Sequence, residues 1–130
     1  MSASDNPLFY SQPEALNVAA HGDLSINDKA TLAFAKKTNS VPLLVDEFGL
    51  ACRDYPILFT GGENIIPIAV LGIGSDHNAF VDANGRWENN TYIPAYVRRY
   101  PFLFANQAES DELTLCIDRN DEWVVKGHQN

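Results

Sequence analysis

The side chains best suited to recognition are aromatic and arginine residues in the second half of the chain. Trp, Tyr and Arg are the residue types that dominate binding hot spots. The candidate binding residues are Trp87, Tyr92, Tyr96, Arg98 and Arg99. These residues predict a recognition surface for a protein partner or a small ligand. The same residues also fit a structural role, in which arginine caps the aromatic edge of a core.

Catalytic and metal chemistry finds little support in the sequence. The three histidines are His21, His77 and His128. They lie far apart and share no ligand spacing with cysteine pairs, which argues against a zinc or two-histidine iron site. Ser75-Asp76-His77 holds triad residue types, but neighbouring side chains do not converge, so a turn is expected. Cys52 and Cys116 lie in apolar surroundings that disfavour a thiolate. We expect no catalytic residues, no metal and no cofactor, although an enzyme is not excluded.

Charge and hydropathy narrow the range of partners. The formal charge of −8 argues against nucleic acid and against anionic membrane surfaces. The longest nearly apolar run, residues 65–73, is too short to span a bilayer. Residues 1–20 lack the features of a secretory signal, which predicts a cytoplasmic protein. An unknown protein or a small ligand is therefore the expected partner, and a homo-oligomer could form through an exposed strand edge.

The stretch from Tyr92 to Phe104 must position most of these side chains. Pro94 can open a helix, and Pro101 disfavours helical geometry at Tyr100. The resulting helix is too short to be stable alone, so packing must hold it. Residues 102–104 then read as a short buried strand.

An earlier segment resembles this one position by position. Residues 53–59 read R-D-Y-P-I-L-F, and residues 98–104 read R-R-Y-P-F-L-F. Each follows a helical pattern that a proline opens, at Pro42 and at Pro94, and each leads through a polar turn to another apolar strand. Two similar units would explain the match, and coincidence between two helix-to-strand junctions is the alternative.

The expected fold is a small single α+β domain, mainly antiparallel sheet with two short helices and an internal pseudo-repeat. We expect an N-terminal arm over residues 1–20, the α+β domain over 21–126 and a frayed tail over 127–130. Further strands are expected at residues 24–26, 32–35, 57–59, 65–73, 79–81, 113–117 and 123–125, and a helix beginning near Pro42.

Several segments, taken together and in order, resemble the bacterial SapC family, named for a surface-layer-associated protein. The matching segments are H-G-D-L at His21, V-P-L at Val41 with Glu47-Phe48, D-Y-P-I-L-F at Asp54, P-I-A-V-L-G at Pro67, N-A-F-V-D-A-N-G-R-W at Asn78, Y-I-P-A-Y-V-R-R-Y-P-F at Tyr92 and L-C-I-D at Leu115.

The resemblance implies a link to the bacterial surface layer but no agreed catalytic residues. It also implies that family members are usually longer at the C-terminus, so this chain is expected to be a shortened member. The function that follows is a non-enzymatic interaction or accessory protein. The alternative is a small-ligand-binding domain or enzyme with an arginine-lined pocket, in which Arg98 or Arg99 would clamp a carboxylate near Asp54 or Glu47.

Overall fold

The computed structural model describes residues 6–127, and residue contacts divide the chain into two compact units. One unit comprises residues 31–98. The other combines the two ends of the chain, residues 1–30 and 99–130. Both are mainly antiparallel sheet with a few short helices, which confirms the predicted α+β class. Residues 128–130 of the expected tail, His128 included, lie outside the described residues.

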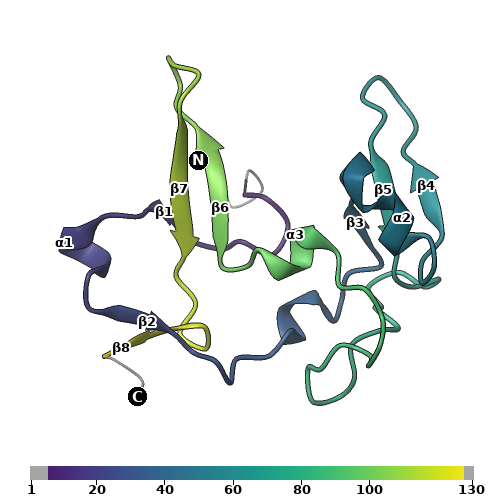
Figure 1. Cartoon of the computed structure of the whole chain (residues 1–130), viewed down its shortest axis with the longest axis horizontal. Helices are drawn as coiled ribbons and strands as arrows, with labels where there is room; N and C mark the ends of the chain where they lie inside the picture. The colour runs from purple at the N-terminus through teal and green to yellow at the C-terminus, as the bar shows by residue number, and fades with distance from the viewer. Residues whose placement is uncertain (1–5, 128–130) are drawn as a thin grey trace. The chain divides into compact units, whose positions relative to one another are not determined.

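The unit of residues 31–98 is built on a three-stranded antiparallel sheet in the order β3-β5-β4 (Figure 1). Its strands are β3 (Ser40–Pro42), β4 (Ile57–Phe59) and β5 (Pro67–Val70). Its helices are the 3-10 helices η2 (Ala33–Ala35) and η3 (Val45–Glu47), followed by α2 (Phe48–Ala51) and α3 (Ala95–Arg98). Val41 and Ala69 pair across β3 and β5 and are fully buried, so the sheet centre is also the core of the unit.

The unit formed by the chain ends has a sheet of the same design, in the order β1-β7-β6 (Figure 1). The strands of this sheet are β1 (Pro13–Ala15), β6 (Phe102–Asn106) and β7 (Leu113–Asp118). A second, two-stranded sheet pairs β2 (Leu24–Ile26) with β8 (Val124–Lys126), and α1 (Val18–His21) precedes it. Residues 13–15 of the expected arm therefore form a strand.

The two three-stranded sheets share details beyond strand order. In each sheet a Tyr-Pro pair directly precedes the first strand of the hairpin, β4 or β6, and each of these tyrosines is 3% exposed. The Val70 N–H donates to the Pro56 carbonyl at 3.0 Å, and the Asp118 N–H donates to the Pro101 carbonyl at 2.8 Å. In both units a third strand pairs antiparallel on the far side of the hairpin. The repeated sequence thus marks a repeated structure.

Three expected elements differ from the structure. Residues 33–35 form the 3-10 helix η2 rather than an edge strand. The helix expected at Pro42 begins at Val45, because residues 40–42 pair with β5 instead. Residues 79–81 form no strand beyond a single bridge between Val81 and Trp87. The Phe80 N–H donates a hydrogen bond to the Asn78 side chain at 2.9 Å instead of to a neighbouring strand. In each case a contact with a distant residue or a side chain displaces the local preference.

None of the helices in residues 6–127 combines the length and the apolar character that a bilayer crossing requires.

Candidate functional site

A buried carboxylate organises the candidate site in the unit of residues 31–98. Glu47 closes η3 and is 7% exposed. Its carboxylate accepts the Leu44 N–H at 2.8 Å, the Ala95 N–H at 2.7 Å and the Tyr92 hydroxyl at 2.6 Å. The carboxylate therefore ties η3 to the start of α3, and it fixes the position of the Tyr92 ring. Charge-assisted hydrogen bonds of this kind are the strong ones in proteins.

Arg98 lies on the Tyr92 ring at the end of α3. Its guanidinium carbon is 5.4 Å from the ring centroid, a cation–π distance. The guanidinium also donates to the Tyr92 hydroxyl at 3.1 Å and to the Ile93 carbonyl at 2.8 Å. The Arg98 side chain is nevertheless exposed. A charged and oriented group thus stands at the surface, above a tyrosine that the core holds in place.

The network sets the ionisation of its members. Burial alone would raise the pKa of Glu47, but the hydrogen bonds from Tyr92, Ala95 and Leu44, with the charge of Arg98, lower it below 4.5. Burial and the hydrogen bond to Glu47 raise the pKa of the Tyr92 hydroxyl. At neutral pH the site therefore holds an ionised carboxylate, a neutral phenol and a guanidinium.

Tyr55 connects this network to Trp87. The Trp87 indole N–H donates to the Tyr55 hydroxyl at 2.9 Å, and that hydroxyl donates to the Tyr92 carbonyl. The Tyr92 N–H in turn donates to the Asp54 carboxylate at 2.8 Å. Burial is the main cause that raises the pKa of Tyr55. Trp87, Tyr92 and Arg98, predicted from their residue types, are therefore joined by hydrogen bonds within one unit.

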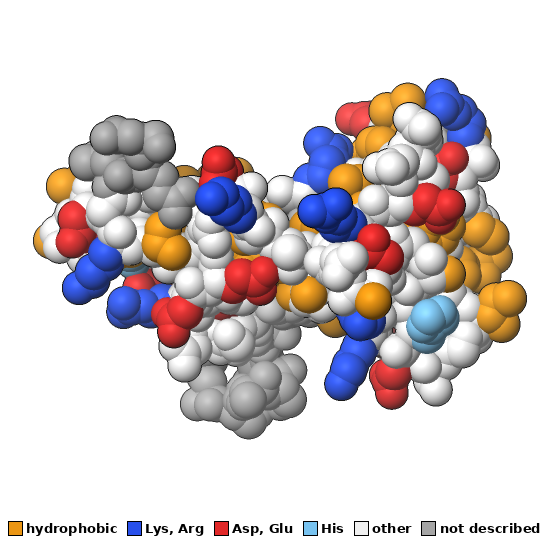
Figure 2. Space-filling view, turned by 90° about the horizontal axis from the view of Figure 1, so that it is seen from below, with side chains coloured by type: hydrophobic (Ala, Val, Ile, Leu, Met, Phe, Trp, Pro, Cys, Tyr) orange, Lys and Arg blue, Asp and Glu red, His pale blue; other side chains and the backbone are white. Residues whose placement is uncertain are grey.

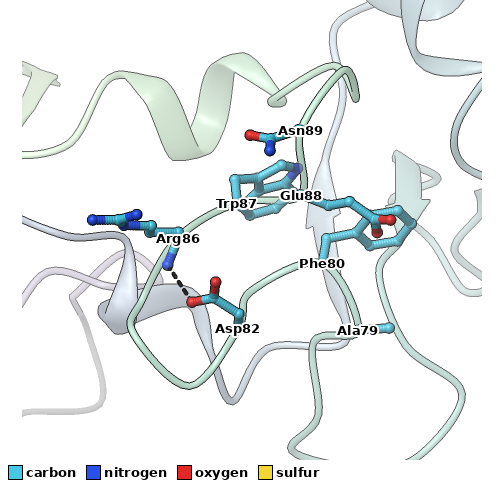
Figure 3. Close-up of a pocket in the computed structure, with 7 residues that line it drawn as sticks. All are labelled: Ala79, Phe80, Asp82, Arg86, Trp87, Glu88 and Asn89. Carbon is cyan, nitrogen blue, oxygen red and sulfur yellow. Dashed lines mark hydrogen bonds between the residues drawn. The ribbon is translucent and has the colours of Figure 1, made fainter.

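A hollow with a volume of about 460 Å³ opens beside Trp87 (Figure 3). The residues that line it are Ala79, Phe80, Asp82, Arg86, Trp87, Glu88 and Asn89. The Phe80 ring stacks on Trp87 with centroids 6.1 Å apart and planes at 16°, and it meets Tyr55 edge-on at 4.7 Å. These contacts give the hollow an aromatic wall of fixed orientation.

The rim of the hollow is polar and carries both signs of charge. Asp82 accepts the Asn84 N–H at 2.8 Å and the Arg86 N–H at 2.9 Å, which closes the turn (Figure 3). The exposed side chains of Arg86, Glu88 and Asn89 make no hydrogen bond with any residue in the described range 6–127. They are available to a ligand.

The other predicted residues lie elsewhere. Tyr96 is half-buried on α3. Arg99 belongs to the unit of the chain ends, where its guanidinium carbon is 5.4 Å from the Tyr10 ring centroid. The sequence analysis did not single out Phe80 or Glu88 as site residues. The sequence feature that could have indicated Phe80 and Glu88 is the turn at residues 82–85, because such a turn reverses the chain and brings the residues before and after it face to face.

The unit of the chain ends holds a similar buried carboxylate. Asp118 is fully buried and accepts the Ser11 and Gln12 N–H groups at 3.0 and 2.6 Å and the Tyr100 hydroxyl at 2.6 Å. Burial and this hydrogen bond raise the pKa of Tyr100. Asn120 donates to the same hydroxyl at 3.0 Å.

Three further side chains, those of His21, Cys52 and Cys116, bear on catalytic or metal chemistry. The Nε2 atom of His21 lies 2.7 Å from a carboxylate oxygen of Glu14, at hydrogen-bond distance. Within residues 6–127, no group of three His, Cys, Asp or Glu residues is placed to hold a metal. Cys116 is buried, whereas Cys52 is exposed and not in the apolar setting that its sequence context suggested.

A family model described as SapC matches residues 16–130. The chain belongs to the SapC family. The resemblance read from the sequence is thereby confirmed, and the SapC match spans the Glu47 network and the hollow beside Trp87. Comparison with curated proteins and with solved structures finds no match.

Proposed function

We propose that this SapC-family chain is a non-enzymatic interaction or accessory protein, linked to the bacterial surface layer, that binds a protein partner through its aromatic and arginine residues. The binding surface centres on Tyr92 and Arg98 in the unit of residues 31–98, with Trp87 and Tyr96 of the same unit as further predicted members, and Arg99 is the predicted binding residue of the other unit. The observation that carries the proposal is the exposed Arg98 guanidinium, held over a ring that Glu47 fixes from below. A pre-oriented arginine loses little conformational freedom when it binds.

Exposed apolar side chains in the same unit favour an interaction protein. Leu44 and Val45 are 65% and 72% exposed, and Leu58 and Phe59 on the edge strand β4 are 54% and 62% exposed. Exposed apolar groups that lie together commonly mark interaction sites. Figure 2 shows Lys and Arg side chains as well as Asp and Glu side chains at the surface, and a surface of mixed charge suits a protein partner better than a polyanion.

The test is affinity capture from a lysate of the native host with the double variant Arg98→Ala/Arg99→Ala. We expect the variant to lose the protein that the wild type retains, while its melting temperature stays nearly unchanged. Arg53→Ala is the matched control, because Arg53 is also an exposed arginine two residues before a Tyr-Pro pair. Unchanged capture would show that the two arginines do not bind the partner, and a large fall in melting temperature would assign them to the fold.

The second candidate function is binding of a small ligand, which the hollow beside Trp87 favours. Its aromatic wall and convergent polar side chains are the features of ligand pockets, and its volume lies within their usual range. This site departs from the arginine clamp expected from the sequence, since Arg86 rather than Arg98 or Arg99 lines it.

A further inference from the structure

The hollow in the unit of residues 31–98 has a fixed aromatic wall. Phe80 contacts Trp87 face to face and Tyr55 edge to face, so two neighbours determine its ring plane. Trp87 is 8% exposed, and its indole N–H donates to the Tyr55 hydroxyl. Phe80 is half-buried and so is more accessible than Trp87. Phe80 therefore offers the apolar surface on which a ligand can pack.

The polar rim combines acceptors with donors. Glu88 and Asp82 supply carboxylate oxygens, Arg86 supplies N–H donors, and Asn89 supplies one of each. Figure 3 shows the Asn89 amide near the Trp87 ring and the Glu88 carboxylate near the Phe80 ring. Because both charge signs occur on one rim, a neutral ligand with many hydroxyl groups would satisfy more of it than a simple anion or cation.

We propose that this hollow binds a sugar ring in its pyranose form. A pyranose presents a face of C–H groups that packs on Phe80 and a rim of hydroxyls that can both donate to Glu88 and Asp82 and accept from Arg86 and Asn89. The open hollow of about 460 Å³ has room for a ring at the end or within a glycan chain. The inference rests on the second candidate function, ligand binding at this hollow.

The chain supplies its own spectroscopic test, because it has two tryptophans. Trp87 lines the hollow and Trp123 lies in the other unit. The ¹⁵N-labelled full chain is titrated with methyl β-glucoside, methyl β-galactoside and methyl α-mannoside, and the two indole N–H signals are followed after assignment with Trp123→Phe. We expect at least one glycoside to shift the Trp87 signal with a Kd on the order of 1–10 mM, and to leave Trp123 in place.

Two variant pairs make the result specific. Glu88→Gln with Asn89→Ala removes rim groups that make no internal hydrogen bond, and it should weaken glycoside binding by about tenfold. Glu63→Gln with Asn64→Ala changes the same dipeptide in the exposed β4–β5 turn of the same unit and should leave binding unchanged.

The outcomes separate the ligand class from ligand binding itself. Sorbitol carries comparable hydroxyls without a ring face, so an equal shift of Trp87 with sorbitol would overturn the pyranose assignment and leave ligand binding intact. A stronger shift with tetramethylammonium would show instead that the hollow recognises cations. If no probe shifts Trp87 at about 100 mM, both the pyranose assignment and ligand binding at the hollow are wrong.

Discussion

The two units use the same parts, a Tyr-Pro tyrosine and a buried carboxylate, but connect them differently. Asp118 and Glu47 each accept two backbone N–H groups and one tyrosine hydroxyl. In the unit of the chain ends that hydroxyl belongs to Tyr100 itself. In the unit of residues 31–98 the Tyr55 hydroxyl reaches the Tyr92 carbonyl instead, and the Tyr92 hydroxyl reaches the carboxylate.

Tyr92, which lies between the Tyr-Pro tyrosine and the carboxylate in the unit of residues 31–98, distinguishes the two units. The Tyr100–Asp118 pair is closed and fully buried, so its role is to hold the sheet and the N-terminal segment together. The Tyr92–Glu47 pair extends to Arg98, whose side chain is exposed. One arrangement thus ends inside the protein and the other ends at its surface. Substitutions in the two networks should therefore differ in their effects on stability.

Removing the buried carboxylate of Asp118 should have the largest effect. Asp118→Ala removes a fully buried acceptor and leaves its three hydrogen-bond donors, among them the buried Tyr100 hydroxyl, without that partner. We expect a loss of about 3–5 kcal/mol in the free energy of unfolding, measured by urea denaturation. A loss below about 1 kcal/mol would show that water or a rearranged chain satisfies these donors and that the pair does not hold this unit together.

Removing each Tyr-Pro hydroxyl compares the two units directly. Tyr100→Phe removes a bond to the Asp118 carboxylate, which is worth about 1.5–3 kcal/mol. Tyr55→Phe removes a bond to a neutral carbonyl, which is worth about 0.5–1.5 kcal/mol, and it also leaves the buried Trp87 indole N–H without its acceptor, which adds about 1–3 kcal/mol. The same urea measurement on both variants compares the two losses, and we expect the loss for Tyr55→Phe to be at least as large as that for Tyr100→Phe, because the Tyr55 hydroxyl serves two partners in its unit. A clearly smaller loss for Tyr55→Phe would contradict this expectation.

The pH dependence of stability should identify Glu47. Its folded-state pKa lies below 4.5, so its contribution to stability is complete above pH 4.5 and declines as the pH falls toward the folded-state value. Glu47→Gln lacks this titration. The difference in unfolding free energy between wild type and variant should therefore shrink as the pH falls from about 6 to about 3. A difference that stays constant over this interval would exclude the lowered pKa.

Arg98→Ala should have the smallest effect on stability. The side chain is exposed, and surface interactions of this type contribute about 0.5–1 kcal/mol at most. Thermal unfolding of this variant beside Arg53→Ala would measure it. A cost well above that of the control would make Arg98 a structural residue and weaken the contrast between the units.

The sequence predicted the parts of this fold that depend on neighbouring residues. The apolar runs after each Tyr-Pro pair and the helix after Pro94 are where the pattern placed them. The carboxylate networks could not be predicted, because their partners lie far apart: Ala95 is 48 residues from Glu47, and Ser11 is 107 residues from Asp118. The SapC resemblance included both acids within its segments but gave them no role.

The hollow illustrates the same limit. Residues 82–85 read D-A-N-G, a turn sequence because Asn and Gly accept positive φ, and Trp87 was predicted as a recognition residue. That Phe80 would lie against Trp87 depends on the fixed ring of Tyr55, 25 residues earlier in the numbering than Phe80. The local sequence therefore predicted the loop, whereas the hollow beside Trp87 depends on packing between residues that are distant in the sequence.

The central claim is that the Tyr92–Arg98 arrangement binds a partner while the Tyr100–Asp118 arrangement only stabilises the fold. The most direct measurement is capture of host protein by Arg98→Ala and by Tyr100→Phe, at a temperature at which both variants are folded. The account predicts that Arg98→Ala loses the partner at nearly unchanged stability and that Tyr100→Phe retains it despite being destabilised. Retention by Arg98→Ala together with loss by Tyr100→Phe would contradict it.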